Sequence, residues 1–166
     1  MDSKDHALNA NEELVKLVFK LPANDGPIAS ESLWTERLGS TLFRVRNVPF
    51  YLYGVSEQDV VRAEESEVRL TVSGITDRGG HSTYRIFLPA QDSEEQFAAD
   101  WIRLQELGCT YERATRRLVA IDVPPQADVY AVYDALARGE KQGRWEFEEA
   151  HCGHPLREEP ATKPNA

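Results

Sequence analysis

The sequence predicts an α+β protein with two parts: an N-terminal antiparallel β-sheet or partial barrel, followed by a ferredoxin-like βαββαβ half. Two observations predict this fold class. Residues 13–80 contain short runs of alternating apolar and polar residues, separated by glycine, asparagine and proline, which is typical of antiparallel strands. Residues 81–150 alternate strand-like and helix-like patterns in the order strand, helix, strand, strand, helix, strand. We expect a flexible N-terminus at residues 1–12 and a disordered tail at residues 151–166.

The first half begins with a strand whose alternate residues are apolar. Val15, Leu17 and Phe19 share one face of this strand, and Pro22 ends it. Residues 33–75 contain further short strands rich in β-branched and aromatic residues. A curled sheet of this kind buries one face, and we expect arginines on the other face, namely Arg44, Arg46, Arg62 and Arg69.

The second half contains two helices that are marked by their ends. The first helix follows Ser93, which with Gln96 fits a capping box, and it ends at Gly108. The second helix follows Asp128, and we expect Gly139 to close it. Its predicted buried face consists of Val129, Val132, Tyr133 and Leu136.

Composition limits the classes of partner. The chain has 28 acidic and 19 basic residues among 166, a net charge of −9. Such a charge repels phosphate backbones, so nucleic acid is an unfavourable partner, whereas a basic protein would be attracted. No run of 18 apolar residues and no signal peptide is visible, so we expect a cytoplasmic protein that does not bind membranes. Two cysteines are too few for a disulfide scaffold.

The segment DRGGHST offers a candidate ligand site. Arg78 could bind an anion and His81 could act as a general base, with Asp77 beside them. Ser82 follows His81 directly, and on an extended chain the two side chains point to opposite faces, so they do not form a catalytic pair. The structural interpretation is favoured: Gly79 and Gly80 turn the chain between the halves, and a strand starts after them.

Metal and cofactor signals are weak. The segment HCGH, residues 151–154, places two histidines near a cysteine, but no C-x-x-C pair elsewhere in the chain completes a zinc site. The nucleotide-binding patterns G-x-x-x-x-G-K-[ST] and G-x-G-x-x-G are absent. Cys109 is expected to be a buried structural thiol. The sequence therefore predicts no metal and no cofactor.

Charged groups in both halves are candidates for binding a protein partner. A solvated loop or turn is the first interpretation of each group, and a docking face for a partner is the sharper alternative. The acidic candidates are Glu57, Asp59, Glu64, Glu65 and Glu67, and the basic candidates near the hairpin turn are Arg113, Arg116 and Arg117.

Several motifs in fixed order carry a family resemblance. They are SESLWTERLG, FRVRNVPFYLYGVSEQDVVRAE, GGHSTYRIFL, RLVAIDVPP and GRWEFEEAHCGH. Over residues 13–154 the chain resembles a family of small bacterial proteins catalogued as a domain of unknown function. The family has no established reaction or catalytic residues to transfer. Some relatives resemble stand-alone proteins encoded near toxin systems, so the resemblance implies an antitoxin or immunity protein.

These observations favour a non-enzymatic, cytoplasmic protein-binding module. Its most specific form is an immunity protein that occludes a basic toxin domain, with acidic side chains that steer the partner. The alternative is a small-molecule binder or an enzyme that uses a cleft at the seam of the two halves, near Arg78 and His81.

Overall fold

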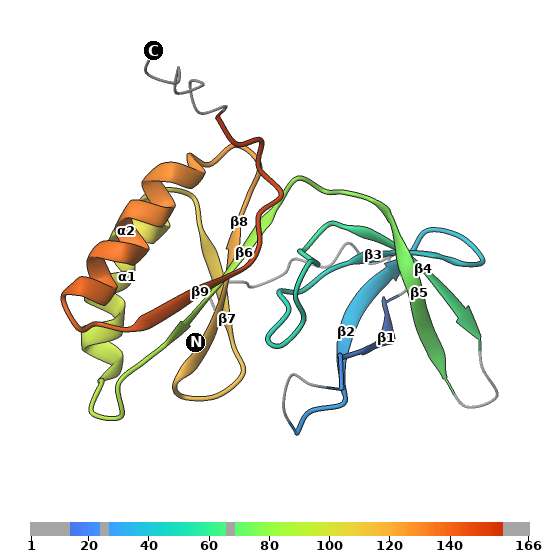
Figure 1. Ribbon diagram of the computed structural model, residues 1–166, viewed down its shortest axis with the longest axis horizontal. Helices are drawn as coiled ribbons and strands as arrows, with labels where there is room; N and C mark the ends of the chain where they lie inside the picture. Colours follow the sequence, from blue (N-terminus) through green and yellow to red (C-terminus); the bar gives the residue numbers. More distant parts are fainter. Residues whose placement is uncertain (1–13, 24–26, 66–68, 158–166) are drawn as a thin grey trace, which may run out of the picture.

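The computed structural model describes residues 14–23, 27–65 and 69–157 (Figure 1). These residues form a closed β-barrel followed by a four-stranded sheet with two helices, so the mixed α+β class is confirmed. The expectation for residues 1–12 lies outside the described residues, as does Glu67. No helix in the described part of the chain is long and apolar enough to cross a lipid bilayer.

The barrel is a meander of five strands in chain order. The strands are β1 (Leu14–Lys20), β2 (Ser30–Arg37), β3 (Leu42–Val45), β4 (Val60–Glu65) and β5 (Leu70–Asp77). Neighbours along the chain pair in the antiparallel sense. Because the number of strands is odd, the first and last run parallel where the barrel closes, and they meet at Val18 and Thr71. The sequence predicted an antiparallel sheet or a partial barrel, and the structure has a closed barrel.

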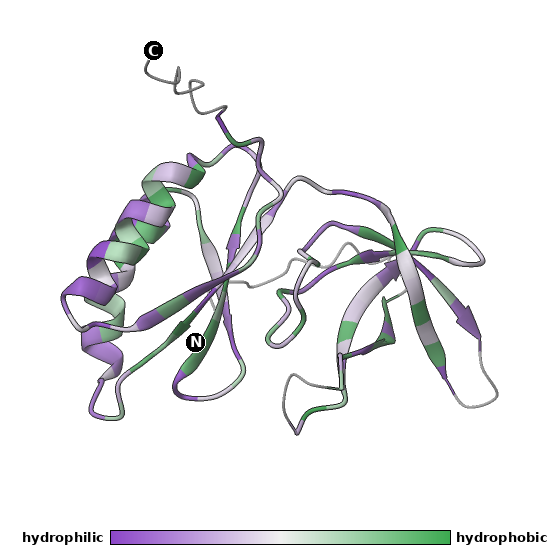
Figure 2. Cartoon of the chain, in the orientation of Figure 1, coloured by the Kyte–Doolittle hydropathy of each residue, from purple (hydrophilic) through white to green (hydrophobic). Residues whose placement is uncertain are grey.

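The barrel core follows the predicted alternation. Leu17 and Phe19 of β1 are buried, whereas Lys16 before them and Lys20 after them are exposed. Figure 2 shows the same alternation of apolar and polar residues along the barrel strands. The apolar side chains of the barrel core with no exposed surface are Leu17, Leu33, Phe43, Val45, Val61 and Ala63. This burial of alternate residues fixes the strand register, since a shift by one residue would expose the core face.

The second half is a sheet covered by helices. Its elements are β6 (Ser82–Phe87), α1 (Glu94–Glu106), β7 (Thr110–Arg113), β8 (Leu118–Val123), α2 (Val129–Lys141) and β9 (Glu146–His151). The strand order is β7-β8-β6-β9, and all neighbours are antiparallel. Both helices lie on one side of the sheet, away from the barrel (Figure 1). Their apolar faces pack on Tyr84, Ile86 and Ile121 in a second hydrophobic core.

The helix ends agree with the sequence at three of four points. Ser93 accepts a hydrogen bond from the Gln96 amide, and Asp128 accepts from the amides of Tyr130 and Ala131. Gly108 takes a positive φ of 90° directly after α1. The predicted end of the second helix at Gly139 is wrong, because α2 continues to Lys141.

Gly139 has a packing role instead. A Cβ atom at this position would lie 2.2 Å from the Trp145 ring, so a glycine lets the helix sit against that tryptophan. The positive φ that follows the helix belongs to Gly143. Tyr133, predicted to be buried on the same helix, is 48% exposed, and its ring packs edge-on against Phe147 of the edge strand β9.

The connection between β3 and β4 joins the two halves. Residues 46–59 reach over the sheet on the face opposite the helices (Figure 1). Ser56 shares a 2.7 Å hydrogen bond with Thr83 of β6, and Arg85 donates to the Leu52 carbonyl. The Gly54 amide donates to the carbonyl of Ala150 in β9. These bonds tie the barrel to the sheet through backbone and side-chain polar groups.

The C-terminal segment differs from the disordered tail expected from residue 151. Residues 151–157 are described, and His154 is 92% buried by the rest of the chain, with 8% exposed. The reason is that β9 pairs with β6 up to His151, which directs the following residues onto the end of the sheet. Residues 158–166 lie outside the described part.

Candidate functional site at the polar seam

Polar side chains gather around the start of β6, some where the barrel meets the sheet and others where the C-terminal segment meets it. We call this group the polar seam; its members are Ser56, Asp59, Arg78, His81, Ser82, Thr83, Asp122, His151 and His154. Most of these side chains are buried. Buried polar groups need hydrogen-bond partners, so the pairing within the polar seam decides what it can do chemically.

Asp59 is the centre of the first group of bonds. Its carboxylate is 1% exposed and accepts from the Ser56 amide at 3.0 Å, from the Gly79 amide at 2.9 Å and from Arg78 Nη1 at 2.9 Å. Arg78 Nη1 also lies 2.7 Å from the Gly54 carbonyl. A Cβ at position 79 would lie 2.6 Å from Gln58, so only glycine fits the close approach. Arg78, predicted to bind an anionic ligand, therefore binds a carboxylate of its own chain.

His81 forms a second pair with a different carboxylate. His81 Nδ1 donates to Asp122 Oδ1 at 2.8 Å, and the histidine side chain is 15% exposed. A carboxylate that orients the imidazole in this way is also found beside general bases. Asp77, the third predicted ligand residue, is exposed near the end of β5. Arg78 and His81 thus bond to two different carboxylates of the polar seam, Asp59 and Asp122.

Ser82 and His154 form a third, fully internal pair. Ser82 Oγ lies 2.7 Å from His154 Nδ1, and His154 Nε2 lies 3.0 Å from the Pro124 carbonyl. The carbonyl accepts only, so Nε2 carries a proton towards it; with the imidazole neutral, Nδ1 accepts from the Ser82 hydroxyl. The Gly153 amide donates to the same oxygen at 2.9 Å. Because Ser82 has no exposed surface, this pair fixes the C-terminal segment rather than presenting a nucleophile.

His151 completes the seam beside Arg78. Arg78 Nη1 lies 3.4 Å from His151 Nε2. Burial, and then the Arg78 charge, lower the pKa of His151 below its ordinary value. All three described histidines therefore gather where the DRGGHST segment meets the HCGH segment. These segments lie far apart in the sequence, and the pairing of β6 with β9 brings them together.

The cysteines and the described acidic groups do not assemble a metal centre. Among the described residues, no group of three or more histidine, cysteine, aspartate or glutamate side chains is arranged to hold a metal ion. Burial, followed by the Asp122 charge, raises the pKa of Cys109 to about 12, so its thiol stays protonated at neutral pH. Cys152 Sγ lies 3.7 Å from Ser82 Oγ at the seam.

The predicted acidic docking residues divide between interior and surface. Glu57 is 4% exposed, and Asp59 is committed to the seam, so neither presents its carboxylate to a partner. Glu64 and Glu65 are exposed at the end of β4. Asp59 was predicted to lie at the surface because it is charged and its neighbours are polar. The turn that leads into β4 instead needs a buried acceptor for its amides, and Asp59 supplies it.

The predicted basic cluster is bound to its own chain. Arg113 pairs with Glu94 at 3.2 Å and lies over the Phe97 ring. Arg116 donates to the carbonyl of Asp92, and Arg117 donates to the carbonyl of Leu88. The three arginines hold the β7–β8 turn against the connection from β6 to α1.

A groove that sequence analysis missed lies at the rim of the sheet. We call it the acidic groove; its volume is about 210 Å³, and it is lined by Arg85, Ile86, Phe87, Leu118, Glu146, Phe147 and Glu148. The Phe87 side chain is 43% exposed there. Glu148 accepts from the Tyr53 hydroxyl at 2.7 Å and pairs with Arg85, and its hydrogen bond raises the pKa of Tyr53. The alternation of glutamates in β9 was the available signal.

The family described as domain of unknown function DUF4265 matches residues 31–147. The chain belongs to this family. The match runs from β2 into β9, so DUF4265 includes most of the barrel and the whole sheet up to its last strand. The family resemblance seen in the sequence is thereby confirmed.

A solved structure shares the fold. The chain is similar to a protein described as a novel crystal structure of a hypothetical protein from Neisseria gonorrhoeae, with a TM-score of 0.70 and 19% sequence identity. The similarity covers 83% of this chain and 94% of that one. None of the curated proteins compared with the chain matches it. The two-part architecture therefore occurs in a sequence of low identity.

Proposed function

We propose that this DUF4265 chain is a non-enzymatic protein-binding module whose acidic groove receives a basic protein surface. The groove combines an exposed aromatic ring, Phe87, with the exposed carboxylate of Glu146. Aromatic residues are enriched at the centres of interfaces, and charges at the rim accelerate encounter with a partner of opposite charge. The net charge of −9 favours the same partner. This groove is the observation that carries the proposal.

The pairing within the polar seam supports a non-enzymatic role. Arg78 and Ser82, two polar groups of the candidate segment, each bond to a side chain of this chain. A catalytic group must instead reach a substrate atom. In its most specific form, the proposal makes the chain a cytoplasmic immunity protein that covers the active site of a basic toxin domain, as the family resemblance implies.

We also infer that the second half is a ferredoxin-like unit. The supporting observations are the order β6-α1-β7-β8-α2-β9, the antiparallel sheet β7-β8-β6-β9 and two helices on one face. The barrel covers part of the other face through residues 46–59. The acidic groove lies at the rim of this sheet, where β6, β8 and β9 meet.

The test is recovery of a partner from the native cell. The tagged chain is purified at moderate salt, and the proteins that accompany it are identified by mass spectrometry. We expect one stoichiometric basic partner, and we expect Glu146→Lys to lose it. The matched control is Asp134→Lys, which makes the same charge change on an exposed position of α2. Retention of the partner by Glu146→Lys, or its loss in both variants, would refute binding at the acidic groove.

The toxin form of the proposal has its own experiment. A toxin gene adjacent to the gene for this chain is induced with and without the chain, and cell survival is counted. We expect survival with the unaltered chain and death with Glu146→Lys. Death in both cases would rule out immunity while leaving a different basic partner for the first experiment to identify.

One observation favours the alternative, a small-molecule site near Arg78 and His81. The His81–Asp122 pair has the geometry of a base and its orienting carboxylate, and the imidazole is partly exposed. Thermal-shift screening of anionic metabolites tests this site. A stabilising compound whose effect disappears in His81→Gln would support the alternative, and no shift with any compound would reject it.

A further inference from the structure

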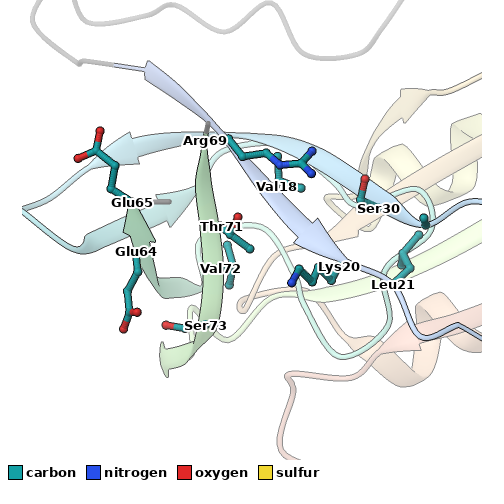
Figure 3. A pocket seen from close by; sticks show the side chains of 11 residues that line it. Val18, Lys20, Leu21, Ser30, Glu64, Glu65, Arg69, Thr71, Val72 and Ser73 are labelled. Atoms are coloured by element: carbon teal, nitrogen blue, oxygen red, sulfur yellow. The ribbon is translucent and has the colours of Figure 1, made fainter. Parts of the chain in front are cut away.

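Two hollows of the molecule differ in the charges that line them. The hollow between β1 and β5 has a volume of about 600 Å³, and both signs of charge line it: Lys20 and Arg69 are cationic, and Glu64 and Glu65 are acidic (Figure 3). A second hollow, of about 130 Å³, is lined by residues of α1, of α2 and of the turn after α2, and it has three arginines and one acidic residue. An excess of one sign of charge identifies the class of ligand, so the second hollow is the better candidate for a binding site.

Helical spacing places the first groups of this second hollow, which we call the arginine pocket. Asp100 and Arg103 lie three residues apart on α1, so their side chains share one face of that helix. Ala135, Arg138 and Gly139 share one face of α2 in the same way. Two of these three α2 residues are the small residues alanine and glycine, which leaves space between the helices for a ligand.

The turn after α2 supplies the third arginine and a buried wall. Gly143 turns the chain with a positive φ of 72°, and the Arg144 amide donates to the Gly139 carbonyl at 2.9 Å. Trp145, which is 5% exposed, lines the pocket, and its indole N–H donates to the Leu136 carbonyl at 3.0 Å. These bonds also occupy two carbonyl groups near the C-terminus of α2, where the helix dipole is negative and would oppose an anion.

The guanidinium groups of the arginine pocket are neutralised only in part by their own chain. Arg138 forms no side-chain hydrogen bond, ion pair or ring contact with any residue that the structure describes. Arg103 pairs with Glu106 at 3.3 Å, but both side chains are more than half exposed, at 62% and 60%, so water screens this pair. Arg144 lies 3.6 Å from Asp100, the one acidic group among the described residues that line the pocket. The lining groups together carry two positive charges, in a chain whose net charge is −9.

We propose that the arginine pocket binds a phosphate monoester group. Guanidinium groups present paired donors that match the oxygens of phosphate. A phosphate monoester carries a charge of about −1.5 to −2 at pH 7, which matches the pocket, whereas a carboxylate carries a single negative charge. The volume of about 130 Å³ is well below the roughly 300 Å³ at which pockets for whole small molecules begin, so the pocket holds one phosphate group and the rest of the ligand extends past the exposed arginines. The arginine pocket shares no residue with the acidic groove and does not depend on the function proposed for that groove.

The test is an NMR titration of the isotope-labelled full chain with phenyl phosphate and with benzoate, which share a ring and differ in the anionic group. We expect phenyl phosphate to shift the Trp145 indole signal and to bind more tightly than benzoate. Arg138→Gln should weaken phenyl phosphate binding about tenfold, the loss expected for one hydrogen bond between charged groups. Lys141→Gln removes the same charge from the last turn of α2, outside the pocket, and should weaken binding less than about twofold. Arg138→Lys keeps the charge but not the paired donors, so its affinity should fall between those of the two variants.

Two sources can present this group, a small phosphate ester or a phosphorylated side chain of a protein. A short peptide with one phosphoserine and blocked ends distinguishes them. Equal affinity for the peptide and phenyl phosphate supports the proposal and assigns the pocket to small esters, whereas tighter binding of the peptide supports it and assigns the pocket to a phosphorylated protein. An unshifted Trp145 indole signal with both ligands, benzoate binding as tight as that of phenyl phosphate, or equal weakening by Arg138→Gln and Lys141→Gln would each overturn the proposal. None of these results bears on the acidic groove.

Discussion

The two hydrophobic cores and the polar seam are held together in different ways. Each core consists of apolar side chains on alternating strand positions or one helix face, such as Phe43 in the barrel and Leu136 under the sheet. The seam consists of buried or half-buried groups that bind through single directed bonds, such as Asp59 with Arg78. Apolar contacts tolerate small shifts, whereas each bond in the seam requires its particular partner.

The cores and the seam therefore have different roles: the cores stabilise each half, and the seam sets how the two halves are oriented. The cores stabilise each half by removing apolar surface from water, a non-directional effect. The seam adds little apolar burial, but it sets the orientation of the barrel against the sheet through bonds such as Ser56 to Thr83. We therefore expect core substitutions to lower the overall stability and seam substitutions to uncouple the halves.

The largest expected effect is that of Phe43→Ala. Phe43 has no exposed surface in the barrel core, so the truncation leaves a cavity and should lower the free energy of unfolding by about 3–5 kcal/mol. Urea denaturation measures the loss. Phe87→Ala is the control, because it removes the same ring from a position that is 43% exposed, and it should cost less than about 1 kcal/mol. Equal losses in the two variants would show that burial does not decide their effects.

A smaller effect with a different character is expected for Asp59→Ala. The substitution leaves the amides of Ser56 and Gly79 and the Arg78 guanidinium without their acceptor, which should cost about 2–3 kcal/mol. It should also separate the unfolding of the barrel from that of the sheet, where Trp101 and Trp145 report by fluorescence. Asp77→Ala, on an exposed residue of β5, is the control and should have almost no effect. A single unchanged transition would contradict a coupling role for the seam.

Most of the fold was predictable because its signals are local. Alternation in β1 and the caps at Ser93 and Asp128 depend on a few neighbouring residues, and the structure confirms them. Gly139 shows where prediction from local patterns fails. Glycine commonly ends a helix, but here the reason for glycine is the Trp145 ring, a contact that no local pattern contains.

The polar seam was only half predictable. Arg78 and His81 were singled out by residue type, but their partners come from other parts of the chain, and Ser82 and His154 lie 72 residues apart. Such contacts follow from strand pairing between β6 and β9, which composition and spacing do not specify. The same limit explains why Asp59 was taken for a surface acid and why the glutamates of β9 were passed over.

The smallest expected effect is a pH dependence of the seam through His151. Burial and the Arg78 charge lower the pKa of His151 in the folded chain, whereas in the unfolded chain it has the ordinary value of about 6.5. As the pH falls through about 6.5, the unfolded chain therefore takes up the proton first. The contribution of His151 to stability is complete above this pH and declines below it, until the folded pKa is reached.

His151→Gln tests this contribution, because glutamine does not titrate. Urea denaturation between pH 8 and pH 5 should show a shallower loss of stability in the variant than in the unaltered chain. Arg78→Gln should also make the loss shallower, because it removes one of the two causes that lower the pKa. NMR titration of the His151 imidazole in the folded chain gives the pKa directly. A titration at or above the ordinary value would contradict both expectations, and it would mean that Asp59 and Glu149, which raise the pKa, outweigh burial at this end of the seam.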